Sequence, residues 1–378
     1  MAKKGFALND LTSLRGPIRD SGWVLCVGAG TSGGLFPDWP SLVESMMTDD
    51  AVVTDRNGLL TSLRTAKGFS LDALIQAAQD RLGLPDNEFA DRLAKHLYSQ
   101  LYSQLPADPI RSRMLKCLAA VAPGEHSQRE WKQFIDDVSG VKRIPSAVTL
   151  AEQIAIIRGT EMAPKAILTF NAEPLLYALI NAQCAVRSTK SVPSPRANVA
   201  EPQIMDPITR SISARRTERI PYYFCHGLLS VRGGGGGLLE DGSPEKLVFS
   251  ESEYLSLANA SFSWQASTFI SLALSHSMVF VGTSFTDSNI RKWLSWMYEN
   301  RRHEIHQRAS IATRRVGSSM TKLGAGSSTL HYWLNVRPKV PGEQEWTESL
   351  VAHLGVRLVW LDDWSEIGPA ISRLTGAK

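Results

Sequence analysis

Short apolar runs that stop at glycine or at a polar residue recur along this chain, and they constrain its fold more than any other feature. The first, Trp-Val-Leu-Cys-Val at residues 23–27, ends at the glycine-rich segment 28–34. Further runs follow at residues 166–170, 220–225, 277–281, 331–336 and 356–361. Continuous apolar runs of this length are typical of strands that are buried on both faces of a sheet.

Segments with helical periodicity separate these runs. They are residues 8–19, 41–47, 174–183, 288–307 and 343–354, together with the first part of the apolar segment 264–285. Strands that alternate with helices favour parallel pairing, because each crossover returns the chain to the same end of the sheet. The sequence therefore predicts an α/β fold with a doubly wound, mainly parallel, Rossmann-like sheet covered on both faces.

Residues 70–158 depart from this alternation. Apolar side chains recur there at helical spacing, as in Leu71, Ile75 and Ala78, and no convincing strand interrupts them. We expect residues 70–158 to form a helical insertion subdomain, with residues 1–69 and 159–378 forming the sheet domain. The segments expected to be irregular are residues 187–219, rich in Ser, Pro and Arg, and the five glycines at 233–237.

Composition excludes several classes of protein. A net charge of +4, with 43% apolar and 21% charged residues, is that of an ordinary globular protein and does not identify a nucleic-acid binder. Polar residues such as Gln265 and His276 interrupt the most apolar segment, so no membrane span is expected. The basic start is not followed by an apolar stretch, so we expect no signal peptide and a cytoplasmic location.

The cysteines argue against a metal site. The chain has four, Cys26, Cys117, Cys184 and Cys225, and no two of them form a Cys-x-x-Cys pair. A zinc ribbon or a disulfide framework needs closely spaced pairs. We therefore expect no metal and no zinc module.

Polar residues follow the ends of four predicted strands. They are Thr31 and Ser32, Asn171, His226, and Ser284 with Asp287. In an open parallel sheet, ligands bind beyond the carboxyl ends of the strands. Singly, each residue has a simpler explanation, since Asn171 and Asp287 could cap helices and His226 could be a turn residue. Their common position predicts a single site at this edge of the sheet.

The segment after the first strand has glycines at positions that are typical of phosphate-binding loops. Glycine lets a backbone approach a ligand closely, and N–H groups at such turns attract phosphate. Gly28-x-Gly30-x-x-Gly33 also fits the dinucleotide fingerprint of oxidoreductases, which needs an acidic residue about 20 positions later. Only Asp55, at the end of residues 51–55, could serve, and prolines interrupt that unit. An NAD(P)-dependent oxidoreductase stays open as an alternative.

Taken in order, these motifs resemble those of the sirtuin family. The segment 28–32 followed by residues 36–39 resembles Gly-Ala-Gly-x-Ser and the later Pro-Asp-Phe. Residues 169–173 resemble Thr-Gln-Asn-Ile-Asp, residues 225–227 resemble the catalytic His-Gly, and residues 282–284 match Gly-Thr-Ser. The resemblance extends from residue 24 to about 365, and it departs from the family at Phe170, Ala172 and Glu173 and in the missing zinc ligands.

The resemblance implies cleavage of the nicotinamide–ribose bond of NAD⁺, which then is the substrate and needs no metal. Asn171 would orient the ribose or the attacking water, and His226 would accept a proton. The products would be nicotinamide and ADP-ribose, linear or cyclic. The residues that the resemblance implies for NAD⁺ binding are Gly28, Ala29, Gly30, Thr31, Ser32, Pro37, Asp38, Trp39, Glu173, Gly282, Thr283, Ser284 and Asp287.

Each of these groups has an expected role. The N–H groups of residues 30–32 would hold the pyrophosphate, and Ser284 would hold the adenosine ribose. Asp287 would accept from that ribose or only cap a helix. Asp38 would orient the loop over the nicotinamide, whose amide Glu173 would recognise in place of the family's aspartate. Protein deacylation or ADP-ribosyl transfer is disfavoured, because the zinc module that supports the acyl-lysine cleft is missing.

Residues 287–291 and 354–361 resemble the bacterial sirtuin-like defence proteins more closely than the deacylases. This likeness implies an effector of abortive infection against phage. It also implies a homo-oligomer controlled by a separately encoded partner, for which a HerA-type ATPase is one candidate. Nucleic acid is expected to take part only indirectly. Candidate docking surfaces are the helical insertion, residues 187–219 and the basic residues Arg301, Arg302, Arg308, Arg314 and Arg315. A non-catalytic subunit that binds NAD⁺ or ADP-ribose is the other alternative.

Overall fold

The computed structural model contains one eight-stranded sheet whose strands run in the order β1-β8-β7-β6-β2-β3-β5-β4. It describes residues 6–49, 69–105, 108–188, 204–211, 218–229, 231, 247–259, 263–316 and 331–377. The strands are β1 (Phe6–Ala7), β2 (Trp23–Val27), β3 (Ala166–Thr169), β4 (Met205–Ile208), β5 (Ile220–Phe224), β6 (Ser277–Val281), β7 (His331–Val336) and β8 (Val356–Leu361).

Every neighbouring pair of strands in this sheet is parallel. The first strand of the site, β2, lies in the middle, and the chain builds outward from it in both directions. The order β5-β3-β2-β6-β7-β8 is that of a doubly wound Rossmann-type sheet, with β4 and β1 added at the edges. The predicted fold class is therefore confirmed, and the sheet is wholly rather than mainly parallel.

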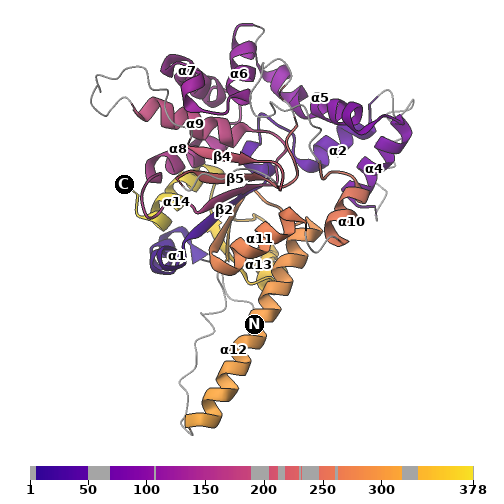
Figure 1. Cartoon of the computed structure of the whole chain (residues 1–378). Helices are drawn as coiled ribbons and strands as arrows, with labels where there is room; N and C mark the ends of the chain where they lie inside the picture. Colours follow the sequence, from indigo (N-terminus) through magenta and orange to yellow (C-terminus); the bar gives the residue numbers. More distant parts are fainter. Residues whose placement is uncertain are drawn as a thin grey trace.

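The strands are buried on both sides, which explains their unbroken apolar character. One face packs against α8 (Ala147–Ile157), α9 (Leu175–Ser188) and α14 (Ile367–Thr375) in a single apolar cluster. The opposite face packs against α11 (Trp264–Ser275), the start of α12 (Ser288–Val316) and α13 (Glu343–Ala352). Figure 1 shows these helices on the two sides of the sheet, and the remainder of α12 extends away from the body.

The predicted helical insertion is present between β2 and β3. Its helices are α4 (Leu71–Leu82), α5 (Asp86–Gln104), α6 (Ile110–Ala119), α7 (Gln128–Ser139) and α8. The first four gather beyond the sheet in Figure 1, whereas α8 lies against α9 and α14 in the layer that covers it. The division of the chain into a separate insertion subdomain and a sheet domain stays a prediction.

The prediction of a loop over residues 187–219 is wrong in part. Within residues 187–219, α9 continues to Ser188 and β4 pairs with β5, with Pro207 opposite Tyr222. The sequence Met-Asp-Pro-Ile has no apolar run to identify it, and a proline is tolerated because β4 is an edge strand. Residues 189–203, 212–217 and the glycines at 233–237 lie outside the described residues.

Several helices were not predicted or differ from their predicted bounds. The expected helix at residues 8–19 is a 3₁₀ turn, Leu8–Leu14, followed by α1 (Arg15–Ser21). Helices α10 (Glu251–Asn259) and α14 were not predicted, and α12 runs nine residues beyond the predicted end at residue 307. None of the helices that the structure describes is both long and apolar enough to cross a membrane.

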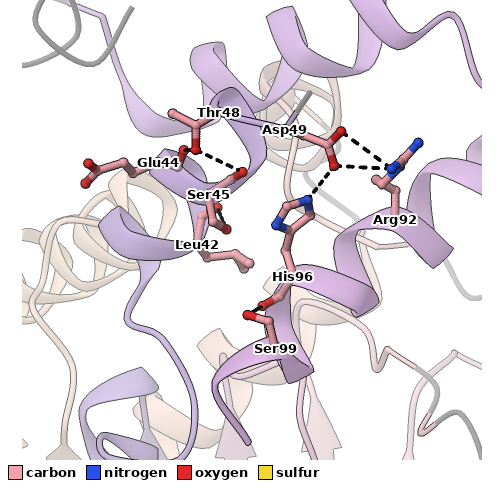
Figure 2. Close-up of polar contacts among 8 residues, drawn as sticks. All are labelled: Leu42, Glu44, Ser45, Thr48, Asp49, Arg92, His96 and Ser99. Carbon is pink, nitrogen blue, oxygen red and sulfur yellow. Dashed lines mark hydrogen bonds and ion pairs between the residues drawn. The ribbon is translucent and has the colours of Figure 1, made fainter. Parts of the chain in front are cut away.

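Helix α2 (Trp39–Met47) links the glycine-rich segment to the insertion. Just beyond its C-terminal end, the buried carboxylate of Asp49 lies 2.7 Å from His96 Nε2 and 3.3 Å from an Arg92 nitrogen, both on α5 (Figure 2). On the same helix, Gln100 and Gln104 donate to the Gly34 carbonyl. Helix α5 therefore holds both the glycine-rich segment and the end of α2.

We predict that Asp49→Asn lowers the free energy of unfolding by about 2 kcal/mol, because it removes the charge from a buried, doubly paired carboxylate. The matched control is Glu299→Gln, whose ion pair with Arg302 is more than half exposed. It should change stability by less than about 0.5 kcal/mol. Urea unfolding of the two variants measures the difference, and equal effects would contradict a structural role for the Asp49 contacts.

Candidate functional site

The four motif-bearing loops leave the sheet at the same level. Val27 is in register with Thr169 on one side and Val281 on the other, and Thr169 is in register with Phe224. The loops that follow these residues begin in neighbouring positions, since adjacent strands are about 4.8 Å apart. Asn171 and His226 are each two residues beyond paired positions of adjacent strands. The structure thus brings the predicted site residues of β2, β3, β5 and β6 to one edge.

Three glycines lock the loop after β2 against the loop after β6. A Cβ on Gly28 would lie 2.7 Å from the Gly282 carbonyl oxygen, and one on Gly30 would lie 2.9 Å from the same atom. Gly282 has a φ of +67°, and a Cβ there would meet the Thr31 nitrogen at 2.6 Å. Glycine is required at these positions because the two backbones touch, and this requirement is independent of any ligand.

The backbone N–H groups of this turn have partners within the protein. Gly28 and Gly30 donate to the carbonyls of Val281 and Gly282, each at 3.0 Å, and Thr31 donates to Gly28. The Thr31 hydroxyl also donates to the Gly28 carbonyl. The N–H of Gly30 thus joins the two turns and that of Thr31 closes the first turn, so both already have partners within the protein. Binding of the pyrophosphate by the N–H groups of residues 30–32 stays a prediction.

Glu173 joins the turn after β2 to the loop between β3 and α9. Its Oε1 accepts from the Ser32 hydroxyl at 2.5 Å and from Asn171 Nδ2 at 2.9 Å. Its Oε2 accepts from the Leu175 N–H, at the start of α9. Both oxygens of Glu173 are thus engaged within the protein, and its recognition of the nicotinamide amide stays a prediction.

Burial sets the ionisation of this carboxyl group. Glu173 is 4% exposed, and burial raises its pKa to about 7, although the hydrogen bonds from Ser32, Leu175 and Asn171 act in the opposite direction. Glu173 also holds the Asn171 amide in one orientation. Asn171 Oδ1 is left buried, with no hydrogen-bond partner in the described part of the chain. An unsatisfied buried acceptor of this kind is suited to a ligand hydroxyl or a water molecule.

His226 is held by contacts from three elements. Its imidazole is edge-on to Phe170, with ring centroids 5.2 Å apart, and to Tyr254 of α10 at 5.5 Å. Its Nε2 lies 3.1 Å from Asp287 Oδ2. Burial and, secondly, the charge of Asp287 raise the pKa of Tyr254 well above its usual value. The histidine is therefore 8% exposed, between two aromatic rings and a carboxylate.

The turn after β6 has an unusual backbone. Phe285 has a φ of +56°, which is uncommon for a residue with a side chain, and its ring is buried against Phe280 and Trp333. This packing fixes the turn. The Ser284 hydroxyl is exposed and lies 2.7 Å from that of Thr286, while Thr283 Oγ1 is buried without a partner among the described residues. Contact of Thr283 and Ser284 with a ligand stays a prediction.

Residues 37–39 have a different place from the other motifs. The exposed Asp38 accepts from the Ser41 N–H at 3.0 Å and caps α2. The Trp39 ring packs on Phe249 at 5.4 Å, and Pro37 is partly buried beside them. Within the described residues no contact joins Asp38 to Asn171 or His226. The structure therefore shows a helix cap at Asp38 and leaves its predicted role over the nicotinamide unsupported.

Two aromatic residues of the site were missed by sequence reasoning. Phe170 stands out in the sequence only as a departure from the sirtuin motif, and Tyr254 lies on α10, which was not predicted. No periodic or spacing signal marks either as a neighbour of His226. The position of Asp55, needed for the oxidoreductase alternative, lies outside the described residues, and the strand next to β2 is instead β3. Among the described residues no group of three or more His, Cys, Asp or Glu side chains could hold a metal ion.

Comparison with known families adds one finding. Residues 196–354 match the family model described as SIR2-like domain, which covers less than half of the 378 residues. The match contains His226 and residues 282–287 but not the glycine turn or Asn171. It supports a sirtuin-like family and is consistent with NAD-related activity, because SIR2-like domains are in general NAD-dependent enzymes. No curated protein matches the chain.

We predict that Gly282→Ala destabilises the protein by about 3 kcal/mol or more, because the new Cβ meets the Thr31 nitrogen. Gly159→Ala is the control, since Gly159 has a similar φ of +74° but no heavy atom within 4 Å of the added Cβ. It should lose only about 1 kcal/mol, from backbone strain alone. Denaturant unfolding compares them. A Gly282→Ala variant no less stable than the control would refute the lock between the two turns.

We predict that Glu173 makes wild-type stability fall as pH rises from about 4.5 to about 7. Between these values the folded carboxyl keeps its proton while the unfolded one has lost it, so rising pH favours unfolding. Glu173→Gln should remove this slope, of about 1.4 kcal/mol per pH unit at most. The measurement is the free energy of unfolding at several pH values. The exposed Glu161→Gln should keep the wild-type slope, and an unchanged slope in Glu173→Gln would exclude a raised pKa.

Proposed function

We propose that this protein is an NAD⁺ glycohydrolase that cleaves the nicotinamide–ribose bond with water, giving nicotinamide and ADP-ribose. The observation that supports this most is the juxtaposition of a buried amide, Asn171, and a buried imidazole, His226, at neighbouring strand ends beside the glycine turn. The match of residues 196–354 to a SIR2-like domain is consistent with NAD⁺ as the ligand.

Hydrolysis of the nicotinamide–ribose bond requires few groups besides these two side chains. Nicotinamide leaves with the electron pair of the C1′–N bond, which neutralises its positive charge, so the leaving group needs no acid. A water oxygen forms the new bond to C1′, and its proton goes to His226. The barrier lies in the positive charge that develops on the ribose, and the free Asn171 Oδ1 is an acceptor that can hold a ribose hydroxyl or the attacking water.

Asn171 is suited to this task because its amide cannot turn freely. Nδ2 is held by Glu173 Oε1 at 2.9 Å, with Thr31 and Ser32 oxygens at 3.5 and 3.4 Å. Rotation of the amide would break these three bonds and place Oδ1 against the acceptor oxygen of Glu173. The acceptor Oδ1 is therefore held in one orientation before the substrate binds. The amide then loses little conformational freedom when the transition state forms.

The biological role and the assembly belong to the same proposal. By the resemblance of residues 287–291 and 354–361 to bacterial sirtuin-like defence proteins, we place the chain as the effector of an abortive-infection system against phage. Unrestrained NAD⁺ loss would kill the cell that makes the enzyme, so we expect a homo-oligomeric or partner-controlled switch, with a HerA-type ATPase as one candidate partner. The exposed side chains of Glu299 and Arg302 on α12 are one place where a partner could dock. The side chains of Arg308, Arg314 and Arg315 lie outside the described residues.

We predict that Asn171→Ala and His226→Ala each lower nicotinamide release from NAD⁺ by about a hundredfold or more while the protein stays folded. The measurement is chromatography of NAD⁺, nicotinamide and ADP-ribose, with the chain alone, with candidate partners, and in cells that express it. Circular dichroism and melting check the fold. Asp38→Asn keeps the α2 cap and should retain most activity.

Three outcomes would contradict the proposal. Full activity in both variants would remove Asn171 and His226 from the chemistry. NAD⁺ or ADP-ribose binding without nicotinamide release in any of the three settings would favour the non-catalytic binding subunit. Conversion of NAD⁺ to NADH with a second substrate would instead point to an oxidoreductase.

A further inference from the structure

We infer that Asp287 is a positioning residue for His226, which fixes the histidine so that Nδ1, and not Nε2, is the nitrogen that accepts the proton. This inference rests on the proposed function. It goes beyond the roles expected for Asp287, which were a ribose acceptor or a simple helix cap. The contacts of the two oxygens of Asp287 carry the argument.

One oxygen of Asp287 is committed to the helix. Oδ1 accepts from the N–H groups of Asn289 at 2.8 Å and Ile290 at 3.1 Å, in the first turn of α12. Two hydrogen bonds to consecutive N–H groups fix the plane and the direction of the carboxylate. The second oxygen, Oδ2, therefore has a set position relative to the sheet.

The other oxygen faces His226. Oδ2 lies 3.1 Å from His226 Nε2, and the side chains are only 14% and 10% exposed. The approach is not aligned as a hydrogen bond, and Oδ2 has no hydrogen-bond partner in the described part of the chain. A buried carboxylate oxygen without a partner is costly, and a charge on the imidazole would offset that cost. An imidazole with its proton on Nε2 therefore directs that proton toward Oδ2.

The remaining surroundings of His226 leave one nitrogen for the substrate. Phe170 and Tyr254 pack edge-on against the ring at interplanar angles of 72° and 74°, and Asp287 occupies the Nε2 side. With its proton on Nε2, facing the carboxylate, the neutral ring carries its lone pair on Nδ1. Nδ1 then takes the proton of the attacking water or ribose hydroxyl, and the imidazolium formed is stabilised by Asp287.

Substitutions at 287 separate the possible roles. In Asp287→Asn, the amide oxygen keeps the helix cap, so its NH₂ group takes the place of Oδ2 and faces Nε2. A donor there requires Nε2 to accept, which moves the imidazole proton to Nδ1 and blocks the base. Asp287→Ser also caps the helix but is too short to reach His226. Asp287→Asn should therefore lower kcat by about a hundredfold and Asp287→Ser by about tenfold, each with KM within about twofold.

The alternatives give different patterns. If Asp287 only caps α12, both variants keep the wild-type kcat, because Asn and Ser are good caps. If it mainly binds ribose, KM rises and kcat is unchanged. The control Ser263→Ala removes the cap of α11, where the Ser263 hydroxyl accepts from the Ala266 N–H at 3.2 Å. It should cost stability and leave kcat unchanged.

A spectroscopic measurement tests the same inference without turnover. The full chain is labelled with ¹⁵N-histidine, and the His226 signals are assigned by their loss in His226→Gln. The wild type should show the Nε2–H form and Asp287→Asn the Nδ1–H form. An Nδ1–H form in the wild type, or identical spectra in the two proteins, overturns the inference. If the spectra change as expected but no NAD⁺ is cleaved, the pairing stands and the proposed function fails.

Discussion

The contact between two glycine turns governs the rest of this structure. Gly28 and Gly30 meet Gly282 so closely that no side chain fits between them, and the N–H of Gly30 donates to the Gly282 carbonyl. This contact joins the loop after the central strand β2 to the loop after its neighbour β6. Because β3 and β5 are in register with β2, the loops that carry Asn171 and His226 begin at the same level. The site is therefore a consequence of backbone packing before any ligand is considered.

Two acidic side chains hold the two residues that are proposed to act on NAD⁺. Glu173 is buried among hydrogen-bond donors and holds the Asn171 amide, while Asp287 caps α12 and faces His226. Each group thought to touch substrate thus has an acidic neighbour that sets its orientation. Glu173 lies two residues from Asn171, whereas Asp287 comes to His226 from a distant part of the chain. This arrangement explains why acidic residues near the site need not contact NAD⁺, although the family resemblance assigned both to its binding.

Much of the fold could be predicted because its strands are continuously apolar. All six predicted strands end within one residue of the expected position, and β2, β6, β7 and β8 end where predicted. Two strands were not predicted, because β4 has a proline and an aspartate among its four residues and β1 has only two residues. In the site, the sequence identified which residues gather but not what they do there. It could not show that the N–H of Gly30 is used internally, that Glu173 turns inward, or that Tyr254 packs on His226, since each depends on contacts between segments far apart in the chain.

The position of the insertion has a consequence for how the molecule forms. The central strand β2 ends at Val27, but its two neighbours begin at Ala166 and Ser277. Closing loops of this length before any pairing energy is gained slows folding, since such contacts are strongly non-local. During synthesis, the acceptor for Gly30 and the carboxylate that faces His226 emerge only after more than 280 residues have been made. A growing or truncated chain therefore lacks a complete site until most of its length exists.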